Sequence, residues 1–246
     1  MAKRRKPIRN PDHGKGLIKR LANQRSNSEA TLGEPQELFT IMDFEVSWGY
    51  MPDPAVAEMT QADKDRMDDI CPLVHTKPQS LIQELRGLVA LYPKVPCLTS
   101  WLINCLRFGT TAERQEAMER GQELFRQMPD YFFSRTTLAD LWLDENNVEK
   151  ANALIFGKGC ELSELYPDRK VFHISEIRNW CYICTRVKIL LGQPQIAKNY
   201  RDMLEDLEPG TKIIRHLDSM LSSENTQLIR LLNELKGLAS GSRTRE

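Results

Sequence analysis

The sequence predicts an all-α protein built from repeated helical hairpins, and three observations support this fold class. Helix-stopping dipeptides stand at Tyr92-Pro93, Met128-Pro129 and Tyr166-Pro167, with a looser fourth at Glu208-Pro209, so the prolines are 36, 38 and 42 residues apart. Proline cannot continue a helix and biases the residue before it away from helical geometry. Pairs of amphipathic helical patterns lie between the stops, and no strand-rich pattern accompanies them. Such hairpins cover one another's apolar faces, which predicts a stacked superhelix, or α-solenoid.

The helical pattern begins at Pro54 with a short helix that extends to about Ile70. Four leucines, Leu81, Leu85, Leu88 and Leu91, then predict a one-sided helix that ends at Tyr92-Pro93. The preceding residues 26–52 mix polar residues with the short apolar stretch 38–42 and carry no secure assignment. We therefore treat residues 31–70 as an N-terminal segment with one short helix.

Three fuller hairpins follow, and each has a turn whose residues suit helix ends. They pair residues 97–108 with 112–127, 131–144 with 148–156, and 174–191 with 195–207. The first turn places Thr110 and Glu113 at capping-box spacing. The second turn, residues 145–147, contains asparagines that tolerate left-handed geometry and cap the next helix. In the third turn, Gly192 ends one helix and Pro194 suits the first turn of the next.

The C-terminal region, residues 211–240 before a tail at 241–246, continues a helical pattern. Leucine and isoleucine recur at alternating spacings of three and four, at Ile214, Leu217, Leu221, Leu228, Leu231, Leu235 and Leu238. One interpretation is a capping helix or helix pair that closes the open end of the superhelix. The other is a short coiled coil that makes the protein a dimer instead of a monomer. Ser222-Ser223 interrupts the pattern and favours the cap.

The spacing and the small and aromatic positions of these hairpins resemble the tetratricopeptide repeat family, whose unit is about 34 residues long. The matching residues are Trp101, Phe108, Ala117 and Pro129 in the first unit, Leu138, Ala139, Trp142, Asn146 and Ala151 in the second, and Gly192, Ala197 and Pro209 in the third. Cys105, Gly121 and Lys188 depart from the pattern, and about four extra residues around 157–160 lengthen the second unit. The resemblance implies a repeat array over residues 71–210. Armadillo-like and pentatricopeptide-like helical repeats are the alternatives.

The resemblance also implies a ligand-binding groove along the first helix of each unit. The matching positions in this chain are Thr99, Leu102, Leu106, Phe133, Thr136, Asp140, Asn179, Tyr182 and Arg186. The family's carboxylate clamp needs several Lys, Arg and Asn residues at such positions, and only Asn179 and Arg186 supply them here. We therefore expect a peptide or helix held by apolar contacts with polar specificity. The alternative for Leu102, Leu106 and Phe133 is that they form the hairpin core.

The formal net charge of zero conceals a basic arm on an acidic body. Residues 1–25 carry nine basic residues and one acidic residue, a net charge of +8, and the remaining residues carry −8. We expect an arm over residues 1–30 that stays disordered, because it has few apolar residues to bury. Its cluster Lys3, Arg4, Arg5 and Lys6 contacts nucleic acid in one interpretation, is a nuclear localisation signal in a second, and only keeps the arm solvated in a third.

Two short motifs superficially resemble reactive sites. Cys181 and Cys184 have C-x-x-C spacing, but they lie in the middle of an apolar helix pattern with no second cysteine or histidine pair, so buried thiols are the favoured interpretation. His173, Ser175 and Glu176 lie close together at an expected helix start, which favours a helix cap. The sequence contains no phosphate-binding loop, dinucleotide fingerprint or zinc-protease motif. It predicts a protein that is not an enzyme and has neither metal nor cofactor.

Two functional hypotheses follow. The first is a scaffold that binds a protein or peptide segment in the groove of the repeat array. The second is an RNA- or ribosome-associated adaptor tethered by the basic arm. The cysteine usage fits a reducing compartment, and no apolar run is long enough to span a bilayer. We therefore expect a cytoplasmic protein, or a nuclear one in a eukaryote, that does not enter a membrane.

Overall fold

The structure is a computed structural model that describes residues 38–41, 44–49, 54–157 and 162–222. The expected arm over residues 1–30, the tail at 241–246, the extra residues 158–160 and the leucine pattern from Leu228 onward lie outside the described residues. The choice between a C-terminal cap and a coiled coil therefore stays a prediction.

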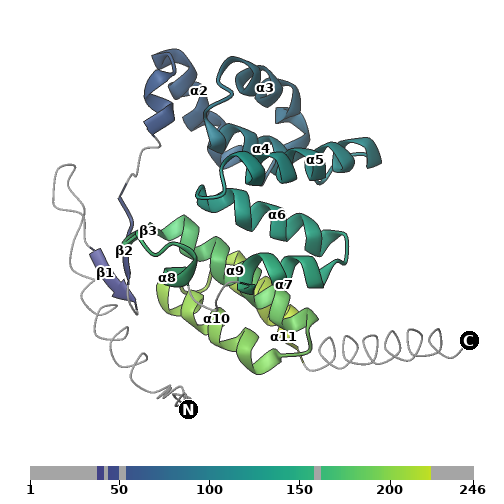
Figure 1. Ribbon diagram of the computed structural model, residues 1–246. Helices are drawn as coiled ribbons and strands as arrows, with labels where there is room; N and C mark the ends of the chain where they lie inside the picture. Colours follow the sequence, from purple (N-terminus) through teal and green to yellow (C-terminus); the bar gives the residue numbers. More distant parts are fainter. Residues whose placement is uncertain (1–37, 42–43, 50–53, 158–161, 223–246) are drawn as a thin grey trace, which may run out of the picture.

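The described chain is mostly helical, which confirms the prediction at the level of fold class. The helices are α2 (Gln61–Ile70), α3 (Pro78–Leu91), α4 (Pro96–Leu106), α5 (Thr111–Gln127), α6 (Phe132–Asp144), α7 (Val148–Phe156), α8 (Leu162–Leu165), α9 (Ile174–Leu190), α10 (Pro194–Leu207) and α11 (Lys212–Leu221), with 3-10 turns η2 (Pro54–Glu58) and η3 (Cys71–Leu73). Figure 1 shows these helices stacked in chain order from α2 to α11. The first helices of the three hairpins, α4, α6 and α9, also pack directly on one another.

The expected hairpin turns are confirmed in atomic detail. Thr110 accepts a hydrogen bond from the Glu113 backbone at 3.3 Å, and the Glu113 carboxylate accepts one from the Thr110 backbone at 2.7 Å. Asn146 has a φ of 56°, and the Asn147 side chain accepts a hydrogen bond from the Lys150 backbone at 3.2 Å. Gly192 has a φ of 70°, the left-handed geometry that glycine adopts at least cost. These local signals fix where each hairpin folds back.

The proline stops also behave as expected. Helices α3, α5 and α10 end one residue before Tyr92, Met128 and Glu208, and each of these residues leaves helical geometry directly before its proline. The prediction that four leucines form the buried side of α3 is correct for Leu81, Leu85 and Leu88. It is wrong for Leu91, which is 69% exposed. Tyr92 packs against the core in place of Leu91, and its hydroxyl donates a hydrogen bond to Asp63 at 2.5 Å.

A small sheet joins the N-terminal segment to the third hairpin, and the sequence did not predict it. Strand β1 (Leu38–Ile41) runs antiparallel to β2 (Phe44–Ser47), and β2 runs parallel to β3 (Val171–His173) just before α9. Phe44 and Val46 point into the core, and the Phe44 ring meets Phe172 edge-on with centroids 5.2 Å apart. On β3, the Val171 carbonyl accepts a hydrogen bond from Arg169 Nε at 3.0 Å.

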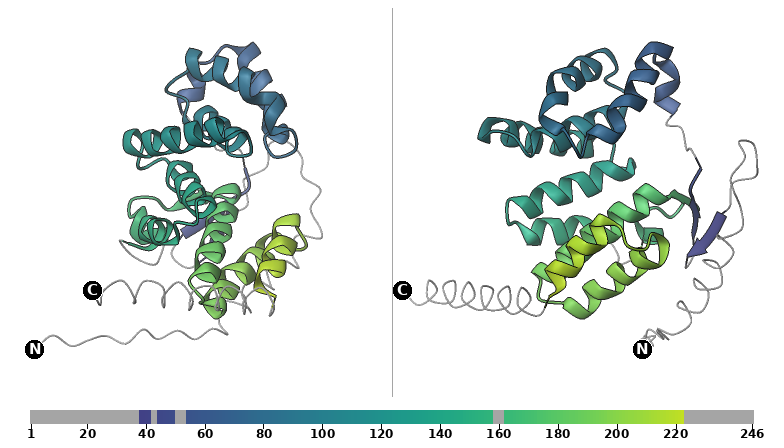
Figure 2. Two further views of the ribbon diagram at one scale, coloured as in Figure 1. Left: turned by 90° about the vertical axis from the view of Figure 1, so that its right-hand side faces the viewer. Right: turned by 180° about the vertical axis from the view of Figure 1, so that it is seen from behind.

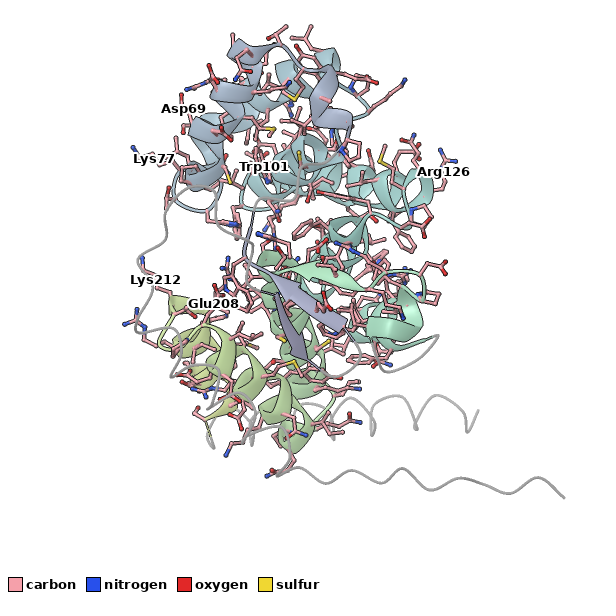
Figure 3. All side chains as sticks on the ribbon, turned by 90° about the vertical axis from the view of Figure 1, so that its left-hand side faces the viewer. Asp69, Lys77, Trp101, Arg126, Glu208 and Lys212 are labelled. Carbon is pink, nitrogen blue, oxygen red and sulfur yellow. The ribbon has the colours of Figure 1, made fainter. Side chains whose placement is uncertain are left out.

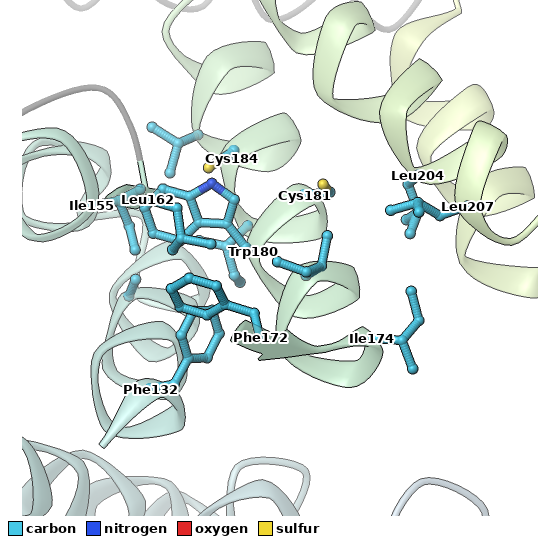
Figure 4. Packing of buried hydrophobic residues seen from close by; sticks show 14 of the residues in the cluster. Phe132, Ile155, Leu162, Phe172, Ile174, Trp180, Cys181, Cys184, Leu204 and Leu207 are labelled. Carbon is cyan, nitrogen blue, oxygen red and sulfur yellow. The ribbon is translucent and has the colours of Figure 1, made fainter. Parts of the chain in front are cut away.

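Two hydrophobic clusters form the interior. The C-terminal cluster gathers β2, α6, α7 and α9 to α11 around the aromatic rings of Phe132, Phe172 and Trp180, shown in Figure 4. The N-terminal cluster gathers η2 to α5, with Leu85, Leu98 and Leu102 fully or almost fully buried. The chain therefore enters the C-terminal cluster first, at β2, and then crosses to the N-terminal cluster at η2. Within the described residues, no helix is long and apolar enough to cross a membrane.

Candidate functional site

The candidate site lies where α6 contacts α4 on one side and α9 on the other, since these are the first helices of the three hairpins. On α6 a row of side chains consists of Phe133, Thr136, Asp140 and Asp144, which are three or four residues apart and so share one side of the helix. Thr136 accepts a hydrogen bond from the Asn179 amide of α9 at 2.8 Å. These contacts join consecutive hairpins side by side through polar groups.

Asp140 is the centre of a buried charge network. Its carboxylate pairs with Arg107, at the end of α4, and with Arg186 of α9, and only 11% of its side chain is exposed. Asp144, one turn further along α6, pairs with the same two arginines at 2.5 and 3.3 Å. Two carboxylates and two guanidinium groups from three helices therefore form a neutral cluster, which suits burial because each charge has partners.

The arginines of this network stay charged. Burial alone would lower the pKa of Arg107, but Asp140 and Asp144 outweigh it and raise the pKa. Arg186 follows the same pattern, with burial opposed chiefly by Asp140. The two guanidinium groups therefore keep their protons and join α6 to α9 and to the end of α4.

An aromatic pair extends this surface to α11. The guanidinium of Arg186 lies 5.5 Å from the centroid of the Tyr182 ring, and the Tyr182 and His216 rings are 6.2 Å apart. Burial raises the pKa of Tyr182. We call the surface that carries Arg107, Asp140, Asp144, Tyr182, Arg186 and His216 the inner face.

The stack of helices is curved. Seen along the stack, the helices follow an arc with α2 and α3 at one end and α10 and α11 at the other (Figure 2). His75 lies in the loop before α3, where partial burial, followed by the positive charges of Arg107 and Arg178, lowers its pKa.

The predicted groove residues divide into two groups. Leu102, Leu106 and Thr136 are completely buried, so the prediction that they contact a ligand is wrong; they are core residues, as the alternative for the two leucines proposed. Asp140 is 8% exposed and is taken up by its arginines. Thr99, Phe133, Asn179, Tyr182 and Arg186 remain partly exposed. The sequence missed Arg107, Asp144, His75 and His216, although Asp144 lies one turn beyond Asp140 and could have been found by helical spacing.

The two motifs that resemble reactive sites have structural roles. Cys181 and Cys184 are completely buried beside Trp180 (Figure 4), and burial raises the pKa of Cys181 to about 12 and that of Cys184 well above its usual range. His173 caps α9: its Nδ1 accepts from the Ser175 backbone at 3.2 Å, and Glu176 accepts from the His173 backbone at 2.8 Å. The predictions of buried thiols and of a helix cap are thus confirmed.

One predicted site lies outside the described residues. It consists of Lys3, Arg4, Arg5 and Lys6, so nucleic-acid contact through the arm stays a prediction. Among the residues that the structure describes, no group of three or more His, Cys, Asp or Glu side chains could hold a metal ion.

Comparisons with known proteins give no family for this chain. No protein-family model, no curated protein and no solved structure matches it. We therefore infer the function from the geometry of the chain itself.

Proposed function

We propose that this protein is a non-enzymatic, tetratricopeptide-like scaffold whose inner face binds a segment of another protein. The observation that carries the proposal is the arrangement of α4, α6 and α9. Three successive hairpins each contribute their first helix to one continuous surface, where partly exposed side chains such as Asn179 and Tyr182 lie next to an ordered charge network. A partner segment that lies across these helices touches several hairpins at once.

The charge network prepares this surface for binding. Arg107 and Arg186 are held by carboxylates before any partner arrives, so little side-chain freedom is lost on binding. Tyr182 adds an aromatic ring with few rotatable bonds, the kind of residue that often dominates binding energy. The cluster that most resembles catalytic groups, His173, Ser175 and Glu176, is engaged in capping α9, which supports a role without catalysis.

The test is recovery of partners from the source cells with matched variants of the full chain. Tyr182→Ala with His216→Ala alters the inner face, and Lys198→Ala on the exposed side of α10 is the control. Arg186→Glu is unsuitable, because it would place a third carboxylate beside Asp140 and Asp144 and destabilise the fold. Mass spectrometry should identify a protein that is lost from the inner-face variant and retained by the control.

Two outcomes would contradict this function. If a folded inner-face variant recovers the partner as well as the parent chain does, the partner binds to another surface of the molecule. Recovery of RNA or ribosomal proteins that disappears at high salt or on deletion of residues 1–25 would favour the tethered adaptor instead.

A further inference from the structure

Arg135 on α6 is a half-buried arginine that pairs with no carboxylate in the described part of the chain. A charge that leaves water without a partner costs free energy. The other half-buried arginines that the structure describes all form ion pairs with carboxylates, and they are Arg86, Arg107, Arg120, Arg169, Arg178, Arg186 and Arg201. The positive charge of Arg135 is therefore open to a ligand.

Neutral groups hold the guanidinium of Arg135 in place. Its Nη1 donates a hydrogen bond to the Leu154 carbonyl, near the end of α7, at 2.9 Å. Its Cζ lies 5.1 Å from the centre of the Phe125 ring on α5 and 5.9 Å from that of Tyr166, the residue after α8. Because these contacts already fix the guanidinium, it loses little freedom when it binds a ligand.

One edge of this guanidinium, formed by Nε and Nη2, has no partner among the described residues. Nε is buried without a hydrogen-bond partner, and Nη2 forms no hydrogen bond either. Elsewhere in the molecule the same edge holds a carboxylate. Arg201 donates from Nε and Nη2 to Asp218 at 2.6 and 2.8 Å, and Arg178 holds Glu208 in the same way. Two parallel N–H donors match the two oxygens of a carboxylate.

The Tyr166 hydroxyl is a further donor beside Arg135. The Tyr166 residue is 7% exposed, and its hydroxyl is buried without a hydrogen-bond partner. Burial raises the pKa of Tyr166, although the charge of Arg135 opposes the rise, so the hydroxyl keeps its proton. A buried hydroxyl without a partner is costly, and a ligand oxygen bound to Arg135 would satisfy it.

None of the described carboxylates near Arg135 pairs with it. Glu123 on α5 pairs with Arg126, which stands at the surface in Figure 3. Those on the adjoining turns pair elsewhere or are exposed, and they are Glu176, Asp130 and Asp168. The side chains of Glu161 and Glu164 lie outside the described residues, so the test includes variants of both.

We propose that Arg135 and Tyr166 form a binding site for the carboxylate of a ligand, which accepts hydrogen bonds from Nε and Nη2 of Arg135 and from the Tyr166 hydroxyl. Arg135 is about two and a half helical turns from Asp144, so this site lies on the opposite side of α6 from the inner face. The inference goes beyond the proposed function and does not depend on it. A carboxylate fits better than a phosphate group, which is usually held by a cluster of arginines.

The test is an NMR titration of the full-length protein with isotope-labelled arginines, followed through their Nε–H signals. The probes are benzoate, a free organic acid, and N-acetylphenylalanine, which resembles the end of a peptide chain. We expect a carboxylate probe to shift the Arg135 signal until it saturates. The signals of Arg178 and Arg201, whose edges are occupied, should stay in place. The probe that binds more tightly identifies the source of the carboxylate.

Three variants separate binding from stability, with affinity measured from the NMR signals of the probe. Arg135→Lys keeps the charge but lacks the paired edge, so it should abolish binding. Tyr166→Phe should weaken binding by about tenfold, the effect of one hydrogen bond to a charged group. It should not lower stability, because the hydroxyl has no partner in the structure. The control Arg114→Lys changes an exposed arginine and should alter neither property.

Four outcomes would overturn the inference. If neither probe binds, an ordered water is enough to satisfy Arg135 and Tyr166. If Arg135→Lys still binds the probes, they bind elsewhere. Inorganic phosphate that binds more tightly than both probes would make this a phosphate site. A shift of the Arg135 signal in the Glu161→Gln, Glu164→Gln variant without any probe would show that the chain's own carboxylate occupies the site.

Discussion

At the scale of single residues, Asp140 has the largest expected effect on stability. It is buried, and two arginines from different helices depend on it, whereas Asp144 serves the same arginines from a more exposed position, with 37% of its side chain accessible. A charge left without its partner in the interior is costly, but an exposed pair contributes little.

We therefore predict that Asp140→Ala lowers the free energy of unfolding by about 3–5 kcal/mol. Asp144→Ala should cost about 1 kcal/mol or less. Urea denaturation followed by circular dichroism measures both values. Equal losses of unfolding free energy in the two variants would contradict this prediction. They would show that Asp144 or solvent can replace Asp140 as the partner of the two arginines.

His173 makes stability depend on pH in a defined direction. Its Nδ1 must be unprotonated to accept the hydrogen bond from Ser175, and burial lowers its pKa below the ordinary value of 6.5. The folded state therefore disfavours the proton that the unfolded chain binds. The stabilisation is complete above about pH 6.5, declines as the pH falls below it, and is gone below the folded-state pKa.

His173→Asn should keep a capping side chain while removing this titration. We expect the variant to lose less stability than the parent chain between pH 7 and pH 5, as measured by thermal unfolding at each pH. His75, whose pKa is also lowered, remains in both proteins and cancels in the comparison. Parallel pH profiles for the two proteins would contradict this role of His173.

At the scale of the elements, two helical glycines allow a matched comparison. A Cβ added at Gly87 in α3 meets nothing within 4 Å, whereas one added at Gly121 in α5 would approach Leu141 Cδ1 to 2.7 Å. Gly121 stands at a position where the tetratricopeptide pattern has an aromatic residue, and its lack of a side chain lets α5 approach α6 closely.

We predict that Gly87→Ala raises the free energy of unfolding by about 0.5–1 kcal/mol, since it removes only the backbone freedom of the unfolded chain. Gly121→Ala should gain less or lose stability, because the Leu141 side chain must move. Chemical denaturation of the two variants gives the comparison. A larger gain at Gly121 would show that Leu141 has room to shift.

The sequence predicts those parts of the elements that depend on neighbouring residues. Caps, turn asparagines and proline stops act over three or four residues, so the ends of α5, α7 and α10 could be predicted closely. Strand β3 is only three residues long and pairs with β2, which is more than a hundred residues away, so no local period announces it. Which side of a helix stays exposed depends on how the neighbouring hairpin packs on it. For this reason the sequence did not reveal that Leu102 and Thr136 are buried.

At the scale of the whole molecule, β2 belongs to the C-terminal cluster, whereas the described segment that follows it belongs to the N-terminal cluster. Val46 is completely buried in the C-terminal cluster, while the next described segment, η2, packs in the N-terminal cluster. Truncation of a buried valine removes about 1.5–3 kcal/mol of apolar burial.

We predict that Val46→Ala accelerates amide hydrogen exchange in β3 and the first turn of α9, while α3 and α5 keep the rates of the parent chain. Glu45→Ala, on the less buried side of β2, is the control. Uniform acceleration throughout the molecule would mean that the array unfolds as one unit, and unchanged exchange would mean that β2 contributes no stability.

The sheet also gives this protein a long-range contact that a stack of hairpins alone would not have. In helical-repeat arrays each unit contacts only its neighbours, so separating the two ends strains only local contacts. Here β2 lies on β3 beside the third hairpin, while η2, the next described element, packs in the N-terminal cluster. Because one chain connects β2 to η2, a force that separates the two clusters should act on the pairing of β2 with β3 as well as on the contacts between helices.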